Sequence, residues 1–290
     1  MSSYRFCRTD DIGLLVEALN RCWAPYFPAE PAMTPATFKR SIRDLQVWCS
    51  SCMVAFAGAD PIAVLIGAKR PSATLIHKIA VHPDHRRHGH GRHLLTSLAS
   101  KLAILGPPRI MAEIPEALAP ARALFTAAGY VEETVLTDYV CENATPAQPP
   151  PAGGESRIVI PVTIDDLAAN GLLEQPHPGC WERSIETLTA RKDDIAGLAV
   201  ADERIEACIL YLKPGASAAT SSAEIVSLNS FVDDDGARLT HLLGRLRAQG
   251  LERFRFPKVH PAEVSNQLLE RLGFRAHEGY VREAATARPG

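Results

Sequence analysis

The chain has 290 residues, of which 46% are apolar and 22% charged, so it can fold into two domains that each have a hydrophobic core. The formal net charge is −2 and neither half is strongly basic, which argues against sequence-independent binding to nucleic acid. No apolar run is long enough to cross a membrane, and the start MSSYRF lacks the apolar stretch of a signal peptide. We therefore expect no membrane partner and a cytoplasmic protein.

The pattern of apolar residues predicts the same order of elements in each half: strand, helices, hairpin, strand, helix, strand, helix, strand. In the first half, for example, Asp10-Asp11 precedes a helix with apolar periodicity, and residues 53–66 form the hairpin. Mixed strands followed by helices indicate an α/β (α+β) fold. We expect helices on both faces of a partly antiparallel sheet in each domain.

Seven cysteines are scattered along the chain, an odd number that argues against a disulfide framework. Cys49 and Cys52 form a CxxC pair. No second pair of ligands lies at the spacing of a zinc site, and the pair runs into the strand-like sequence MVAFAG instead of opening a helix. We interpret both residues as ordinary half-buried thiols and expect no metal site.

A proline- and glycine-rich segment at residues 144–156, ATPAQPPPAGGES, cannot continue a helix or lie within a central strand, so it predicts a linker. Residues 1–143 and 157–290 then form two domains. Four patterns of the first half recur in the same order in the second, ending with the Gly-Tyr pair at 129–130 and the Gly-Phe pair at 273–274. This shared order indicates a duplicated domain.

The segment with the clearest chemical signal is residues 75–98, LIHKIAVHPDHRRHGHGRHLLTSL. A strand that ends before Pro83 is followed by a basic, glycine-spaced loop and by a helix with leucines on one face. Backbone N–H groups at a helix N-terminus attract phosphate, and Gly89 and Gly91 let that backbone come close to a ligand. The pattern predicts a pyrophosphate-binding loop. The lysine and hydroxyl residue of a P-loop are absent, which disfavours a nucleoside triphosphatase.

The motif V-x-P-x-x-R-x-x-G-x-G at residues 81–91, followed by two leucines, resembles the acyl-CoA loop of the GNAT acetyltransferases. The strand, helix and turn at residues 113–130 resemble the second motif of that family. The resemblance covers nearly all of residues 4–143 and extends more weakly over 157–285. The whole chain is therefore similar to a tandem GNAT protein whose C-terminal copy is degenerate.

The resemblance implies that the first domain binds acetyl-CoA as a co-substrate, without a metal. The pyrophosphate would lie on the loop, and the pantetheine arm would pair with strand backbone in a gap where two strands splay. The cofactor-binding residues expected in this way are Ile79, Ala80, Val81, Arg86, Arg87, His88, Gly89, His90, Gly91 and Arg92. The implied reaction is direct attack of an amine on the thioester, which needs a base, an oxyanion donor and an acid.

The general acid departs from the family pattern. Phe125 stands where a tyrosine often protonates the CoA thiolate, and its ring has no proton to give. Leu118 stands where an asparagine is frequent at the start of the same helix. A water molecule, or else Tyr130, would have to supply the proton.

Two residues are candidates for the general base. The glutamate that some family members carry on the strand corresponds roughly to Leu75. His77, two residues along, shares its face by alternation and titrates near neutral pH. Glu113 is the rival, because the adjacent strand could point it at the same gap. Each also has a structural interpretation: a half-buried, hydrogen-bonded histidine, and a glutamate in an ion pair with a nearby lysine.

The second domain lacks the basic loop. Asp233, Asp234 and Asp235 stand where the first domain has arginines, and carboxylates repel a pyrophosphate. We expect this copy not to bind CoA in the usual way, but to pack on the first domain and shape the acceptor site.

The lead hypothesis is an acetyl-CoA-dependent N-acetyltransferase whose acceptor is an amine of a small molecule or a protein. Trp23, Tyr26 and Phe27 follow the first helix in the region that GNAT proteins use as an acceptor-side wall, so we predict that they bind substrate. The alternatives are a non-catalytic acyl-CoA-binding or scaffold protein, for which Phe125 and Leu118 argue, and an acyltransferase acting on a hydroxyl or thiol. Either a monomer or a homodimer fits the sequence.

Overall fold

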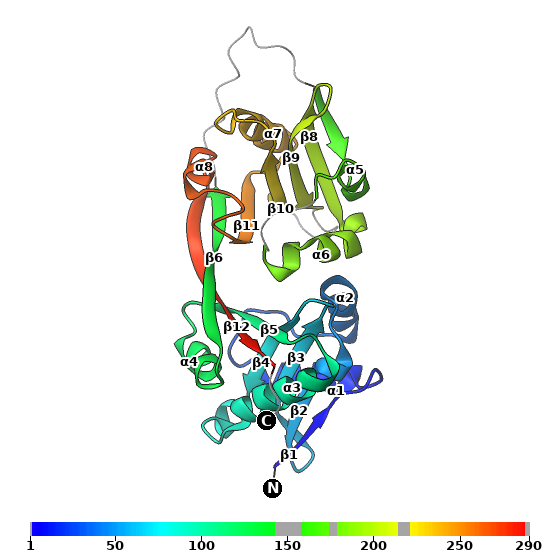
Figure 1. Cartoon of the computed structure of the whole chain (residues 1–290), viewed down its shortest axis with the longest axis vertical. Coiled ribbons are helices and arrows are strands. Elements are labelled where there is room, and N and C mark those ends of the chain that lie inside the picture. The colour runs from blue at the N-terminus through cyan, green and yellow to red at the C-terminus, as the bar shows by residue number, and fades with distance from the viewer. Residues whose placement is uncertain (1, 143–157, 174–178, 214–220, 288–290) are drawn as a thin grey trace. The chain divides into compact units, whose positions relative to one another are not determined.

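The computed structural model describes residues 2–142, 158–173, 179–213 and 221–287, so the predicted linker at 144–156 lies outside the described residues. The chain divides into two compact units, Met1–Thr134 with Val281–Gly290, and Val135–Tyr280 (Figure 1). These units run differently from the expected domains 1–143 and 157–290, because the last strand of the chain is shared between them. The predicted mixed α/β class is confirmed.

The first unit is built around a mixed sheet. Its strands follow the order β1-β2-β3-β4-β5-β12; β1 to β4 are antiparallel neighbours, and β4 and β5 are parallel. The strands are β1 (Ser2–Phe6), β2 (Met53–Ala57), β3 (Asp60–Lys69), β4 (Thr74–Val81), β5 (Arg109–Pro115) and the end of β12 (Arg275–Thr286). The helices are α1 (Ile12–Cys22), α2 (Pro35–Leu45), α3 (His90–Leu105) and α4 (Ala119–Ala127).

The core of the first unit forms where α3 and α4 pack on the sheet. Figure 1 shows α3 lying across β3 and β4. Leu94, Leu95, Leu98 and Leu102 repeat at helical spacing, are all buried and belong to one cluster with strand residues. Full burial of one such side chain contributes roughly 1.5–3 kcal/mol, so this stripe holds the first turns of α3 firmly beside β4.

The final strand of the chain completes this core. In the strand order β12 lies next to β5, and its residues from Val281 onward belong to the first unit. Ala285 and Ala287 join the same apolar cluster as the leucines of α3, and Arg282 is buried with only 2% of the residue exposed. Residues from near both ends of the chain, such as Tyr4 and Ala287, therefore contribute to one core.

The second unit repeats the plan of the first. Its strands follow the order β6-β11-β10-β9-β8-β7, with β10 and β11 parallel and the neighbouring pairs β6–β11, β10–β9, β9–β8 and β8–β7 antiparallel. The strands are β6 (Val131–Glu142), β7 (Ile158–Val162), β8 (Ile195–Ala201), β9 (Ile205–Leu212), β10 (Ser222–Ser230) and β11 (Arg253–Val259). The helices are α5 (Ile164–Ala169), α6 (Ile185–Ala190), α7 (Ala237–Ala248) and α8 (Asn266–Arg271). Hairpin, parallel strand pair and intervening helix thus occur in the same order in both units.

Candidate active site

The first unit contains a gap between two parallel strands. The ladder between β4 and β5 covers only two pairs, Thr74 with Ile110 and Leu75 with Met111. Beyond Leu75 the two strands separate, and the edge of β4 from Ile76 to Val81 has no ladder partner on β5. The strands therefore splay in the region where the family resemblance places the pantetheine arm.

A β-bulge lies at the start of the gap. Gly67 of β3 lies opposite Ile76 and Ile66 lies opposite Lys78, so His77 is the extra residue of the bulge. The bulge interrupts the two-residue alternation on which the predicted shared face of Leu75 and His77 depends. His77 is half-buried at this point of β4.

The loop between β4 and α3 has the backbone geometry of an anion site. Gly89 adopts φ +83° and is the N-cap residue of α3, with no side-chain hydrogen bond to cap the helix. Arg87 also has a positive φ, of 64°. A Cβ atom added to Gly91 would lie 2.9 Å from Cδ2 of Leu124, so this glycine lets α3 and α4 approach closely. The uncapped N–H groups and the helix dipole together favour a bound anion.

Tyr26 connects the region after α1 with this loop. Its hydroxyl donates to the backbone oxygen of Val81 at 2.5 Å and accepts from Nε of Arg86, also at 2.5 Å. The Arg86 guanidinium lies 4.3 Å from the centroid of the Tyr26 ring. Tyr26, predicted to bind the acceptor, thus contacts two of the residues predicted to bind acetyl-CoA.

The histidines around the loop do not form a metal site in the part of the chain that the structure describes. His90 is 7% exposed, and its Nδ1 lies 2.6 Å from the hydroxyl of Tyr4 on β1. Burial, together with the neighbouring His88, His85 and His93, lowers the pKa of His90. The predicted loop residue His90 therefore ties α3 to β1 as a neutral side chain.

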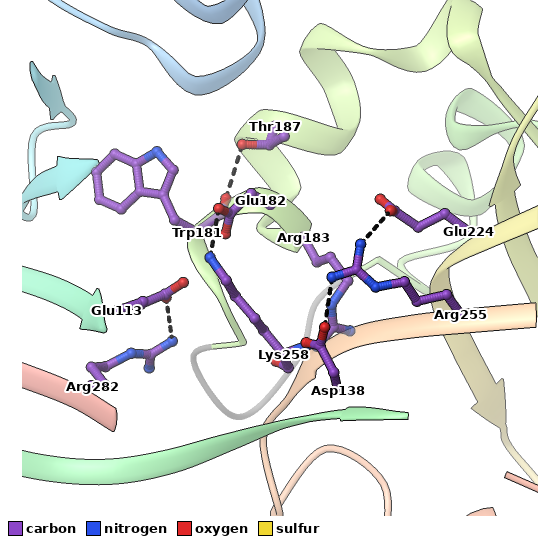
Figure 2. Close-up of polar contacts among 10 residues, drawn as sticks. All are labelled: Glu113, Asp138, Trp181, Glu182, Arg183, Thr187, Glu224, Arg255, Lys258 and Arg282. Carbon is purple, nitrogen blue, oxygen red and sulfur yellow. Dashed lines mark hydrogen bonds and ion pairs between the residues drawn. The ribbon is translucent and has the colours of Figure 1, made fainter. Parts of the chain in front are cut away.

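Glu113 is held in a buried ion pair. Its Oε1 lies 3.0 Å from Nη2 of Arg282 on β12, and the two side chains are 2% and 3% exposed (Figure 2). The sequence hypothesis of an ion pair with a lysine is thus replaced by a pair with an arginine from the far end of the chain. The Arg282 guanidinium thus occupies a carboxylate oxygen that a general base would need for the proton of the substrate amine.

Tyr130 is also buried. It is 5% exposed, its ring meets Phe125 edge-on at 5.0 Å between centroids, and its hydroxyl has no hydrogen-bond partner among the described residues. Burial raises its pKa. Tyr130 lines a cavity of about 290 Å³ beside α3, together with Leu95, Thr96 and Ala99. Leu118, which stands where an asparagine is frequent in the family, is the N-cap residue of α4 and makes no side-chain hydrogen bond to the helix.

An aromatic and charged cluster lies after α1, and we call it the acceptor wall: Trp23, Phe27, Glu30 and Lys78. The rings of Trp23 and Phe27 stack at 4.4 Å, and Nε1 of Trp23 donates to Glu30 at 3.0 Å. Nζ of Lys78 lies 3.9 Å from the centroid of the Trp23 ring and 3.2 Å from Oε2 of Glu30. The aromatic residues are predicted from the sequence, whereas Lys78 and Glu30 are not, although Lys78 is the one formally charged side chain in the strand LIHKIAV.

Cys49 and Cys52 are more deeply buried than the half-buried thiols expected from the sequence. Cys49 and Cys52 are free thiols, and both are buried. Burial raises the pKa of each, which keeps them as unreactive thiols.

The second unit has the same bulged strand and the same glycine at the start of the following helix, but one of its own carboxylates hydrogen-bonds the end of that helix. In β10, Ile225 lies opposite Tyr211 and Ser227 opposite Leu210, so Val226 is the extra residue of a bulge. Gly236, φ +83°, is the N-cap residue of α7. Here, unlike at Gly89, a side chain occupies the anion position at the helix end.

That side chain is Asp234. Its carboxylate accepts from the backbone N–H of Gly236 at 3.1 Å and of Arg238 at 2.9 Å, and from Nη1 of Arg238 at 2.8 Å. Burial opposes ionisation, but the hydrogen bonds from Arg238 outweigh it and lower the pKa of Asp234. A fixed negative charge thus takes the place that a phosphate would need.

The strand gap of the second unit is lined by a network of charges (Figure 2). Asp138, buried on β6, accepts from Nη2 of Arg255 at 2.6 Å and from the backbone N–H of Lys258 at 2.7 Å. Glu224 lies opposite Arg255 in the β10–β11 ladder, as Leu75 lies opposite Met111 in the first unit. Burial raises the pKa of Glu224. The glutamate missing at Leu75 is therefore present in the copy that lacks the basic loop.

Comparison with known proteins agrees with this geometry. Residues 15–130 match the acetyltransferase (GNAT) family. No curated protein matches the chain in sequence. A GCN5-related N-acetyltransferase from Sphaerobacter thermophilus has a similar structure, with 17% identity and a TM-score of 0.66 over 100% of this chain and 96% of that one. The match to the GNAT family thus lies within the first unit of the chain.

Two further solved structures extend the likeness over both units. A tandem GNAT protein from the clavulanic acid biosynthesis pathway is 16% identical, with a TM-score of 0.66 and full coverage of both chains. A GCN5-related N-acetyltransferase from Anabaena variabilis is 11% identical, with a TM-score of 0.65 over 99% of this chain and 73% of that one. The whole chain thus has the fold of a tandem GNAT protein. No helix within the described residues is long and apolar enough to span a membrane.

Proposed function

We propose that the protein is an acetyl-CoA-dependent N-acetyltransferase that works through its first unit. The observation that carries this proposal is the loop at Gly89: uncapped backbone N–H groups at the start of α3 lie at the end of the strand edge that β5 leaves open. A diphosphate fits the first feature and an extended amide chain, such as pantetheine, fits the second.

In this proposal the backbone from Arg87 to Arg92 holds the pyrophosphate, with Arg86 beside it. The backbone of β4 from Ile79 to Val81 pairs with the amide groups of the pantetheine arm. Oriented in this way, the thioester carbonyl would lie near the bulge at His77, within the strand gap. Positioning of this kind accounts for much of the rate in a direct transfer between two bound reactants.

His77 is the base that the geometry favours. It lies at the bulge itself, whereas Glu113 is committed to Arg282 and Tyr130 is buried among apolar side chains. The raised pKa of Tyr130 also makes it a poor acid, so we assign protonation of the CoA thiolate to water. The acceptor would approach along the acceptor wall, where Trp23 and Phe27 present stacked rings.

The second candidate function is non-catalytic binding of acyl-CoA. Phe125 favours it, because this fully buried ring leaves α4 without the hydroxyl that often serves as the acid. The two functions differ in whether free CoA appears when acetyl-CoA and a panel of amines are supplied. The same assay can be repeated with a panel of alcohols and thiols. Release of CoA with these compounds but not with amines would indicate a hydroxyl or thiol acceptor.

Calorimetric titration of the full chain with acetyl-CoA tests the binding site directly. We expect one site per chain, because the second unit carries Asp234 where the first leaves its helix end uncapped. Gly89→Glu should abolish binding, since it adds charge and bulk at a positive φ. Gly58→Glu is the matched control: Gly58, in the β2–β3 turn, has φ +63° and open space around it. Two sites, or normal binding by the Gly89 variant, would contradict the proposal.

A further inference from the structure

Lys78 is the side chain of β4 that reaches into the acceptor wall. Its Nζ lies over the Trp23 ring at 3.9 Å and 3.2 Å from Oε2 of Glu30, and the side chain is only 15% exposed. An amine thus already lies on the surface where the acceptor amine is expected.

The backbone position of Lys78 brings this amine to the reacting group. Lys78 directly follows His77, the extra residue of the bulge, and directly precedes Ile79, whose backbone is expected to pair with the bound pantetheine arm. It also lies on the open edge of β4, beyond the last residue pair of the β4–β5 ladder. A flexible four-carbon side chain rooted here can move from the Trp23 ring into the gap without any change of the backbone.

We propose that Lys78 is a self-acetylation site: bound acetyl-CoA transfers its acetyl group to Nζ of Lys78 of the same chain. The inference rests on the proposed function. The neutral amine attacks the thioester carbonyl, a C–N bond forms and the C–S bond breaks. The ammonium of Lys78 first releases one proton to solvent to give this neutral amine, and after the attack the nitrogen loses a second proton, which the leaving CoA thiolate takes up. The product is a neutral amide inside the acceptor wall.

The contacts of Lys78 predict how the rate depends on conditions. The carboxylate of Glu30 and the π face of Trp23 both stabilise the ammonium form, which is not nucleophilic. Self-acetylation should therefore be slow at neutral pH. As long as the pH is below the pKa of the lysine, the rate should increase about tenfold for each unit by which the pH is raised. Removal of the Glu30 charge should make it faster at a given pH.

Other lysines of the first unit provide an internal comparison. Lys69 on β3 also lies near a tryptophan, 5.9 Å from the Trp48 ring, but its Nζ donates to the backbone oxygen of Leu105. Lys101 on α3 donates to the backbone oxygen of Ser50. Neither lies on the open edge of β4, so neither should be modified faster than an ordinary surface lysine.

The test is incubation of the purified chain with deuterated acetyl-CoA, followed by peptide mass spectrometry with time. The label separates the reaction from acetylation that occurred during expression. We expect label on Lys78 at a rate at least tenfold above Lys69, independent of protein concentration. Glu30→Gln should increase the rate several-fold, whereas Lys69→Arg should leave the labelling of Lys78 unchanged.

Calorimetric titration of the same samples with acetyl-CoA distinguishes failure of self-acetylation from failure of the proposed function. If acetyl-CoA binds and Lys78 is labelled no faster than Lys69, self-acetylation is wrong while the proposed cofactor site stands. If acetyl-CoA does not bind, the proposed function itself fails. Labelling that survives in Gly89→Glu, or that scales with protein concentration, would also overturn transfer within one chain from the bound cofactor.

Discussion

Individual side chains decide whether this loop and strand gap can perform chemistry. Three titratable residues were candidates from the sequence, and their surroundings separate them. Arg282 forms a buried ion pair with Glu113, and burial among apolar neighbours raises the pKa of Tyr130, so neither side chain is well placed to exchange a proton with a substrate. His77 is the remaining candidate for the general base. It is the extra residue of the β-bulge in β4, which interrupts the regular alternation of that strand.

Replacement of His77 by Ala tests this assignment. We expect turnover to fall by about 100-fold or more, the usual contribution of a general base, with acetyl-CoA affinity unchanged. The acidic limb of the pH–rate profile, which reports the base, should disappear in the variant. Glu113→Gln serves as comparison: it should lower stability but keep the shape of that profile. Unchanged turnover in the His77 variant would remove this residue from the mechanism.

Residue types along the sequence reveal some of these roles and hide others. His77 is predicted from its alternation with Leu75 and its titration near neutral pH, and Trp23 and Phe27 are predicted from their place in the family resemblance. The partner of Glu113 could not be read, since Arg282 lies 169 positions away and pairs with it only through a strand contact. Lys78 could have been noticed as a charge within an apolar strand, but its position over Trp23 depends on how a loop folds back.

At the scale of elements, α3 and α7 have the same N-terminal geometry, but only the end of α3 is left open for an anion. Both α3 and α7 start at a glycine with φ +83°, and both follow a bulged strand that separates from its parallel neighbour. Local signals in the sequence were sufficient to predict α3, its loop and the loss of the basic loop in the second unit. They could not show that one of the three aspartates, Asp234, hydrogen-bonds the helix end.

Replacement of Asp234 by Ala tests the role of this carboxylate. It removes a helix cap and a partner of Arg238, so we expect the second unit to lose about 1–2 kcal/mol of stability. Asp233→Ala is the matched control: its exposed side chain should change stability by no more than about 0.5 kcal/mol. Chemical denaturation measures both. The Asp234 variant should still bind one acetyl-CoA per chain, and equal stability of the two variants would argue against the cap.

At the scale of the whole molecule, the units are not consecutive pieces of chain. The sequence predicts a domain boundary after residue 143, because prolines and glycines mark linkers. The structure instead assigns Val281–Gly290 to the first unit. The sequence of β12, RAHEGYVREAAT, has no regular alternation of apolar and polar residues, so the sequence does not show that the end of this strand belongs to the first unit. Fold class follows from local patterns here, whereas the assignment of a strand to a core follows from contacts that only the folded chain makes.

A chain that ends at Tyr280 tests this arrangement. It loses the end of β12, including Arg282, and so leaves the carboxylate of Glu113 buried without the guanidinium that now pairs with it. Breaking one side of such a pair costs about 3–5 kcal/mol, a large share of the stability of an ordinary domain. We expect the shortened chain to lose acetyl-CoA binding and to show fast hydrogen exchange in β5 and α3.

Two further variants separate the ion pair from the rest of the strand. A chain that ends at Ala287 keeps the paired part of β12 and should behave as the full chain does. In the full chain, Arg282→Met alone should reproduce most of the destabilisation, and Arg282→Met combined with Glu113→Met should recover much of it, because two apolar side chains replace two buried charges. If the chain ending at Tyr280 exchanges and binds acetyl-CoA normally, the first unit does not need the last strand. If it fails but Arg282→Met is neutral, the strand acts through its backbone pairing and apolar residues, not through the charge pair.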